Sequence, residues 1–300
     1  MRFLFVDRIL GYEPRTWIRA GHTIPGVDGL LAGPCLVVEA LAQAAGWLIA
    51  ASTGFTRRGL PLSIRSIQLT SPVEAGETVL LEAEIVAWRD DSAHVRGRAS
   101  VDGRALAELQ GGLCGLVPAE RLEDPEQTKA RFSLLVKKGE EESPGVVVAA
   151  ASSKPLTADG GWPAWTGFNR IEGLEEGRRA RAVWNVGLAD DYGGDHFPCL
   201  PIVPGTRQAQ AMAELARLLI EADGNRSPAL KRMTGVKFRR LVRPGDQLVL
   251  EAESRGPISE QAIITVESVI EGKRVASIGE IHFGLAPHPS LRAVSSVSGT

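Results

Sequence analysis

The pattern of apolar and polar positions divides the chain into two stretches with the same order of elements. In each stretch, an apolar segment of helical length precedes shorter segments in which apolar and polar residues alternate, as in half-buried strands. The predicted helices cover about Cys35 to Ala51 and Thr206 to Ala222. The first is apolar nearly all the way round, so we expect it to be buried on most sides. Gly54 follows it, where a left-handed cap residue belongs.

Strand-like alternation follows the first helix. The predicted strands are Ile64–Leu69, Val79–Val86, Ala93–Ala99 and Ala105–Leu109. Asp102-Gly103, between the last two, is typical of a tight hairpin turn. Before the helix, Phe3 to Gly26 indicates a short helical or extended opening and then a strand at Thr16–Ala20. A long helix followed by an antiparallel meander indicates the α+β class.

The second stretch repeats the first at a constant offset. Lys237–Ala252 aligns with Gln68–Ala83, and the same offset of 169 residues separates Gly76 from Gly245 and Gly103 from Gly272. A constant offset over so many strand residues indicates an internal duplication. Two such sheets can join edge to edge and cover edge strands that would otherwise be exposed. We therefore expect the monomer to be a pseudo-dimer.

Composition suggests where the two units are separated. The segment 119–155 contains a charged, helical piece at Glu123–Leu134 and then a passage rich in Lys, Glu, Gly, Ser and Pro, which is typical of a linker. The predicted organisation is an N-terminal unit at 1–118, a linker at 119–155, a C-terminal unit at 156–287 and a disordered tail at 288–300.

Charge and cysteine content narrow the class of protein. A formal net charge of −2 gives no reason to expect nucleic acid or an anionic membrane as a partner. The N-terminal residues reach a charge before any signal-peptide core, and no apolar run is expected to approach the roughly 18 residues of a membrane span. We therefore expect a cytoplasmic protein. Cys35, Cys114 and Cys199 lack the spacing of a disulfide framework or zinc site, and no phosphate loop or Rossmann glycine pattern indicates a cofactor.

Two segments carry candidate chemistry. His196-Phe197-Pro198 and Pro201-Ile202-Val203-Pro204-Gly205 place a histidine on a proline-stiffened loop directly before the second helix. This arrangement suits proton transfer beside a helix N-terminus. The first helix carries a lone carboxylate, Glu39, among apolar and small residues.

These segments resemble the β-hydroxyacyl-acyl-carrier-protein dehydratases (FabA/FabZ-like) of bacterial fatty-acid synthesis, whose fold is the hotdog. The family motif G-H-F-P-G-x-P-x-x-P-G is largely reproduced from His196 to Gly205, with Asp195 and Cys199 in place of the flanking glycines. The family has an acidic residue fourteen positions after the histidine. Here that position is Gln210.

The first half shows the complementary pattern. Glu39–Gly46 resembles the family's acidic helix, but the position fourteen residues before Glu39 is Pro25. In the family, the histidine of one subunit works with the acid of the other. The resemblance therefore implies a double hotdog with one composite active site, built from His196 and Glu39. Pro25 and Gln210 would mark a second site that has been lost.

The implied activity is that of a lyase, a (3R)-hydroxyacyl thioester dehydratase that forms a trans-2-enoyl thioester in fatty-acid or related lipid or polyketide synthesis. His196 is the expected base, and Glu39 is the expected acid, kept protonated by its apolar surroundings. Backbone N–H groups of Gly205 or Cys199 would bind the thioester oxygen, with Gly205 favoured. Gln43 is interpreted either as a contact of the substrate hydroxyl or a water, or as a helix-packing amide.

Other interpretations of single residues remain open. His196 could fix only its own loop, and Glu39 could be a first-turn carboxylate stabilised by the helix dipole. His22 lies in a similar-looking Gly-His-Thr-Ile-Pro-Gly segment, but its spacing to Glu39 is three residues too long, so we interpret it as a strand or loop residue.

The expected partners follow from the same resemblance. The acyl substrate would be carried by acyl carrier protein or by coenzyme A. A basic group on a predicted strand could dock an acidic carrier protein, or could be an ordinary solvated strand face: Lys237, Arg239, Arg240 and Arg243. Further homo-oligomerisation is left open. Two rival functions remain, a hotdog acyl thioesterase and a noncatalytic protein that binds acyl chains or carrier proteins.

Overall fold

The computed structural model describes residues 4–24, 34–141, 167–187, 195–222 and 224–287. The first half contains β1 (Arg8–Glu13), β2 (Trp17–Thr23), α1 (Pro34–Ser52), β3 (Arg57–Leu69), β4 (Thr78–Trp88), β5 (Ser92–Val101) and β6 (Arg104–Pro118), then a 3-10 turn, η1 (Ala119–Arg121), and α2 (Pro125–Glu141). The second half contains β7 (Arg170–Glu175), β8 (Arg179–Asn185), α3 (Gly205–Glu221), β9 (Arg226–Phe238), β10 (Gln247–Ser254), β11 (Gln261–Ile270) and β12 (Lys273–Pro287). The predicted tail and the end of the predicted linker lie outside the described residues.

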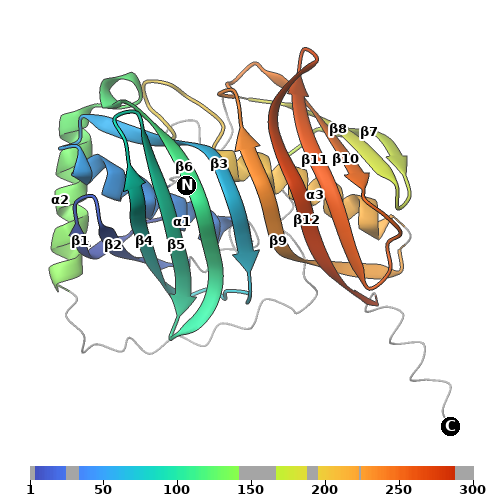
Figure 1. Ribbon diagram of the computed structural model, residues 1–300, viewed down its shortest axis with the longest axis horizontal. Coiled ribbons are helices and arrows are strands. Elements are labelled where there is room, and N and C mark those ends of the chain that lie inside the picture. The colour runs from blue at the N-terminus through green and yellow to red at the C-terminus, as the bar shows by residue number, and fades with distance from the viewer. Residues whose placement is uncertain (1–3, 25–33, 142–166, 188–194, 223, 288–300) are drawn as a thin grey trace, which may run out of the picture.

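All the described strands form one sheet, in the order β1-β2-β4-β5-β6-β3-β9-β12-β11-β10-β8-β7. Outward from the central β3–β9 pair, the first half runs β3-β6-β5-β4-β2-β1 and the second half runs β9-β12-β11-β10-β8-β7, so equivalent strands occupy equivalent places. β3 and β9 run antiparallel, with Ile67 opposite Met233. Figure 1 shows α1 and α3 behind this sheet, each within its own half. Each half is therefore a long helix covered by an antiparallel sheet, as the α+β prediction requires.

Equivalent turns in the two halves have the same backbone conformation. Asp102-Gly103 has φ angles of 47° and 81°, and Glu271-Gly272 has φ angles of 49° and 74°. Both pairs form two-residue hairpin turns in which both central residues have positive φ, which suits glycine at the second position. The hairpin prediction is confirmed, and the offset found in the sequence relates residues with equal structural roles.

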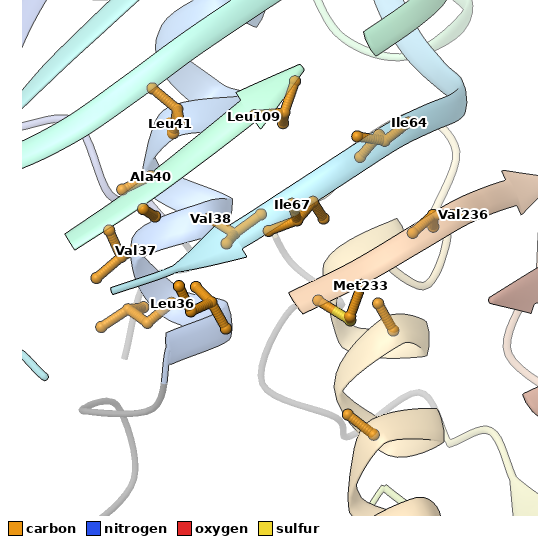
Figure 2. Packing of buried hydrophobic residues seen from close by; sticks show 14 of the residues in the cluster. Leu36, Val37, Val38, Ala40, Leu41, Ile64, Ile67, Leu109, Met233 and Val236 are labelled. Atoms are coloured by element: carbon orange, nitrogen blue, oxygen red, sulfur yellow. The ribbon is translucent and has the colours of Figure 1, made fainter. Parts of the chain in front are cut away.

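The core is continuous across the central strand pair. Figure 2 shows Leu36 and Val38 of α1 near Ile67 of β3, and Met233 of β9 on the other side of the junction. These side chains belong to one buried cluster that includes residues of both halves. Burial of this apolar surface is the main force that holds the halves together.

Helix α1 is buried on most sides, as predicted, because the sheet wraps around it. The expectation that no apolar run would approach the length of a membrane span was wrong. Cys35–Ser52 is an 18-residue window with mean hydropathy 1.6, long and apolar enough for a membrane span by length and composition. However, 72% of this window is buried inside the fold, as in the core helix of a globular unit. Gly54 has φ 59° at the end of the helix, which confirms the predicted cap.

Helix α2 lies in the segment predicted to be a linker, and it packs on the first half. The Phe132 ring is 4% exposed and lies 4.9 Å from Tyr12, 5.3 Å from Phe55 and 5.8 Å from Trp47, measured between ring centroids. The structured first half therefore extends beyond residue 118, and α2 covers the side of the sheet at β1 (Figure 1).

β3 and β6 are much longer than the predicted strands. They pair from Arg57–Pro118 to Leu69–Ala107, with an irregularity at Pro61. Their outer parts are rich in glycine and proline, so the alternating pattern that marks a strand is absent there.

Candidate active site

The histidine loop of the second half is held by backbone hydrogen bonds at both ends. The Ile202 N–H donates to the His196 carbonyl (3.1 Å), and the Cys199 N–H donates to the carbonyl of Leu122 in the first half (2.9 Å). The His196 Nδ1 lies 3.3 Å from the Ile202 carbonyl oxygen. A carbonyl can only accept, so Nδ1 carries the hydrogen. Nε2 of the neutral ring then has the lone pair that can take up a proton.

Glu39 is buried, with 6% of its surface exposed. Its Oε1 accepts a hydrogen bond from the Gln43 amide (2.8 Å), and its Oε2 accepts one from the Thr206 hydroxyl of α3. The Gln43 carbonyl accepts the Phe5 N–H at 2.9 Å, which fixes the orientation of the amide. Glu39 is therefore held by both halves. The first turn of α1 has no acidic residue, so the interpretation of Glu39 as a first-turn carboxylate was wrong.

One pocket contains these groups. Glu39 and Gln43 of α1 line it together with His196 and the first residues of α3, Gly205 and Thr206. Its volume is about 110 Å³, whereas a single water needs only about 10–15 Å³. The carboxyl group and the imidazole, predicted to come from different halves, thus lie in the wall of one cavity.

A second, apolar pocket adjoins the first, between α1 and the sheet. The two share Ala42, Gly46, Gly59, Pro61 and Ile64 in their walls. A Cβ atom on Gly46 would meet no other atom within 4 Å, so the helix leaves open space there. The carboxyl group therefore lies beside a space suited to a hydrocarbon chain.

The electrostatic setting of His196 favours the neutral imidazole. Burial lowers the pKa of His196 below its usual 6.5, and the Arg58 guanidinium acts in the same direction. Glu39 opposes this effect by stabilising the imidazolium. Since burial dominates, the ring stays neutral below the pH at which a solvated histidine becomes charged.

We expect His196 to titrate below pH 6.5 in the folded protein. The measurement is an NMR titration of protein with isotope-labelled histidine, in which His196→Ala identifies the signal. A folded-state midpoint above 6.5 would show that the charge of Glu39 outweighs burial.

Gly205 meets the conditions for the thioester-oxygen contact. It is the first residue of α3, where backbone N–H groups lack intrahelical acceptors. A Cβ atom there would lie 2.9 Å from the Phe238 ring, so a side chain would force the helix start away from its neighbour. The alternative, Cys199, was wrong, because its N–H is taken by the Leu122 carbonyl and its side chain is exposed.

In the second half, the position equivalent to Glu39 carries an amide, Gln210, which pairs with a neighbouring arginine. Gln210 is 6% exposed, and its side-chain carbonyl accepts a hydrogen bond from Arg207 (3.0 Å). Pro25 lies outside the described residues. His22 lies in β2, as expected for a strand residue, and pairs with Asp7 at 3.3 Å.

The basic group is only partly on a strand. Lys237 belongs to β9, which ends at Phe238, so the expectation that Arg239, Arg240 and Arg243 continue the strand was wrong. All four side chains are exposed. Arg240 pairs with Asp246 at 3.1 Å.

Sequence patterns missed Thr206 and the pair formed by Arg58 and Glu123, all of which line the pocket. A hydroxyl directly after the Pro-Gly step was the one available signal for Thr206. Arg58 and Glu123 gave none, because 65 residues separate them and neither lies in a motif.

Comparison with known proteins identifies the family. The FabZ 3-hydroxyacyl-[acyl-carrier-protein] dehydratase of Caldicellulosiruptor bescii is 34% identical over 119 residues, which cover 37% of this chain and 85% of that protein. FabZ of Listeria monocytogenes is 34% identical over 127 residues, covering 40% of this chain and 85% of the relative. The chain belongs to the FabZ dehydratase family. Residues 174–277 also match the ApeI-like dehydratase family.

Solved structures show the fold of this FabZ-family chain as a hotdog. A MaoC-like dehydratase aligns with TM-score 0.56 and 12% identity, over 92% of this chain and 100% of that one. A Lactobacillus plantarum protein described as an oleoyl thioesterase aligns with TM-score 0.56 and 13% identity, over 91% and 98% of the two chains. At this identity the likeness concerns the fold alone.

Proposed function

We propose that this FabZ-family chain is a double hotdog that dehydrates (3R)-hydroxyacyl thioesters at one composite active site. The observation that carries the proposal is the single pocket lined by His196 from the second half and Glu39 from the first. The counterpart of the acid, Gln210, has no carboxyl group, which supports one working site per chain. Single-chain hotdog structures that align over nine-tenths of the chain support the tandem arrangement.

The proposed reaction uses three groups of the pocket. The neutral His196 Nε2 takes the α-proton of the 3-hydroxyacyl thioester while the Gly205 N–H stabilises the negative charge on the thioester oxygen. The electrons of the broken C–H bond form the Cα=Cβ bond and expel the hydroxyl from Cβ. The Glu39 carboxyl group supplies the proton that makes the leaving group water. Gln43 and Thr206 hold its carboxyl group in place.

Hydration of a crotonyl thioester, the reverse reaction, tests this proposal directly. The purified chain is expected to bleach the enoyl absorbance and to yield the 3-hydroxy product of R configuration. Stable enoyl absorbance in the presence of folded protein, with carrier-bound and coenzyme A substrates alike, would contradict the proposal.

Thioester hydrolysis is the second candidate, because proteins of this fold include one described as an oleoyl thioesterase. In that case a carboxylate, Glu39, would activate water. A thiol-trapping reagent distinguishes the two, because hydrolysis releases free thiol without enoyl formation whereas dehydration releases none. Binding of acyl thioesters without either reaction would indicate the noncatalytic alternative.

We further propose that the exposed basic group near the end of β9 docks an acidic acyl carrier protein. The double variant Arg239→Glu and Arg240→Glu should lower kcat/KM for carrier-bound substrate and weaken its dependence on salt, since attraction between charged surfaces speeds association. The coenzyme A substrate should be little affected. Arg255→Glu is a matched control, because Arg255 is an exposed arginine at the opposite end of β10. Equal kcat/KM for the docking variant and wild type would contradict the proposal that this basic group docks the carrier protein.

A further inference from the structure

The histidine loop sits on a platform provided by the other half. A small buried cluster, separate from the main core, joins Leu60 and Leu122 of the first half with Phe197 and Ile202 of the loop. The Cys199 N–H bond to the Leu122 carbonyl lies at the same contact. The position of His196 is therefore set by packing between the halves as well as by its own loop.

Arg58 of β3 is the charged member of this platform. Its guanidinium carbon lies 5.2 Å from the centroid of the Trp47 ring and 5.6 Å from that of Phe197, and its Nε lies 3.0 Å from Glu123. The side chain is 13% exposed. A cation between two aromatic rings is attracted by both, and the attraction grows when the group is removed from water. The Phe197 ring lies 4.4 Å from the His196 ring. Phe197 thus contacts Arg58 on one side and the proposed base, His196, on the other.

Stability alone does not account for a buried arginine at this place. Removing an ion pair from water is costly, and apolar residues of similar volume often stabilise a fold equally well. The cost is visible in the Arg58 Nη1 atom, which is buried and has no hydrogen-bond acceptor among the described residues. Arg58, Glu123 and Trp47 all line the pocket that contains His196 and Glu39.

We infer that Arg58 is a positioning residue of the active site: held by Trp47 and Glu123 of its own half, it fixes Phe197 and with it the imidazole of His196. The inference rests on the proposed dehydratase function and assigns a role to a residue outside the histidine and acid segments. Arg58 is assigned no proton transfer of its own. It acts through the loop and through its charge.

The charge of Arg58 gives this role a distinct signature. Among the residues that the structure describes, the charged groups that line the pocket around His196 are Glu39 of α1, Arg58 of β3, Glu123, Arg131 of α2 and Asp195 of its own loop. The positive charge of Arg58 lowers the pKa of His196. Removing that charge should raise this pKa, so that the base of the dehydration reaction becomes protonated, and the dehydration rate declines, at a higher pH. A residue that only filled space would leave the pH profile unchanged.

The experiment compares kcat/KM for dehydration of a (3R)-3-hydroxybutyryl thioester, followed as the gain of enoyl absorbance, between pH 5 and 8 in wild type, Arg58→Gln, Arg58→Lys and the double variant Arg58→Gln/Glu123→Gln. We expect Arg58→Gln to lower kcat/KM by about tenfold, in line with the loss of a desolvated cation–ring contact, and to move the acid limb to higher pH. Arg58→Lys keeps the charge and should keep the limb near its wild-type position. The double variant removes both charges and should move the limb less than Arg58→Gln does.

Arg57→Gln is the matched control. Arg57 is the preceding residue, exposed, and donates to the Asp90 carbonyl at 2.8 Å, away from the loop. It should retain wild-type kcat/KM. Thermal unfolding of each variant establishes that the protein is folded. If Arg58→Gln does not fold, Arg58→Lys and Phe197→Leu carry the test, since both should lower kcat/KM and their effects should not add.

The outcomes separate this inference from the proposed function. Arg58 variants with wild-type kcat/KM and an unmoved acid limb, in an enzyme that hydrates crotonyl thioester, would overturn the inference alone. An equal loss of kcat/KM in Arg57→Gln would also overturn it. Wild-type protein without hydratase activity would overturn the proposed function itself.

Discussion

His196→Ala is expected to lower kcat for crotonyl-thioester hydration by roughly 100- to 10,000-fold, the usual contribution of a positioned acid–base group. Among the described residues that line the pocket, the imidazole is the side chain with burial, tautomer and pKa suited to a neutral base near pH 7. Nδ1 is engaged with the Ile202 carbonyl, so the loss of Nε2 removes the group that takes the α-proton in dehydration and returns it to Cα in the hydration reaction. The measurement is the rate of loss of enoyl absorbance at saturating substrate.

The rival view, in which His196 only fixes its loop, is tested with His196→Asn. The asparagine amide can still donate a hydrogen bond toward the Ile202 carbonyl, but it cannot accept a proton at neutral pH. Activity of His196→Asn close to wild type would therefore exclude the role as base. Gln210→Ala is the control, since it alters the equivalent helix position of the second half. It should leave kcat nearly intact while lowering stability, because Arg207 loses a buried partner.

The features that the sequence predicts well are those that depend on the local pattern of apolar residues and glycines. The extent of α1, the turn at Asp102-Gly103 and its counterpart at Glu271-Gly272 follow from apolar pattern and glycine position. The association of His196 with Glu39 was also accessible, because each half keeps the part of the family motif that the other has lost. In both cases the signal lies within a few residues or in a comparison of the two halves.

Contacts between distant segments could not be predicted in this way. Thr206 reaches Glu39 over 167 positions, and Arg58 of β3 contacts Glu123, in the turn before α2, and Phe197 of the histidine loop. The choice of Cys199 as a thioester contact failed for the same reason, since its N–H bonds a carbonyl of the other half. Helix α2 was assigned to a linker because its polar surface hides the one buried aromatic residue, Phe132, that anchors it.

Glu39→Gln is expected to lower kcat by a similar factor, roughly 100- to 10,000-fold, because the amide has nearly the same shape but cannot give a proton to the leaving hydroxyl in dehydration or take one from water in hydration. The fold should tolerate the change. The side-chain carbonyl of the introduced glutamine can still accept a hydrogen bond from the Gln43 amide or from the Thr206 hydroxyl, and no buried cation depends on this carboxyl group among the contacts of the described residues. Retention of the unfolding temperature with loss of kcat separates a chemical role from a structural one.

Thr206→Val extends this test across the boundary between the halves. Valine has the shape of threonine but cannot donate to Glu39 Oε2, so the carboxyl group keeps its bond to Gln43 and loses its tie to α3. If Glu39 must be held opposite the His196 loop to reach the leaving hydroxyl, kcat should fall by about tenfold, as for the loss of one buried hydrogen bond of roughly 1.4 kcal/mol. The combined Thr206→Val and Glu39→Gln protein should be no slower than Glu39→Gln alone. Additive losses would instead mean that Thr206 acts on the substrate directly, and the composite site would then owe its geometry to the histidine loop and not to this bond.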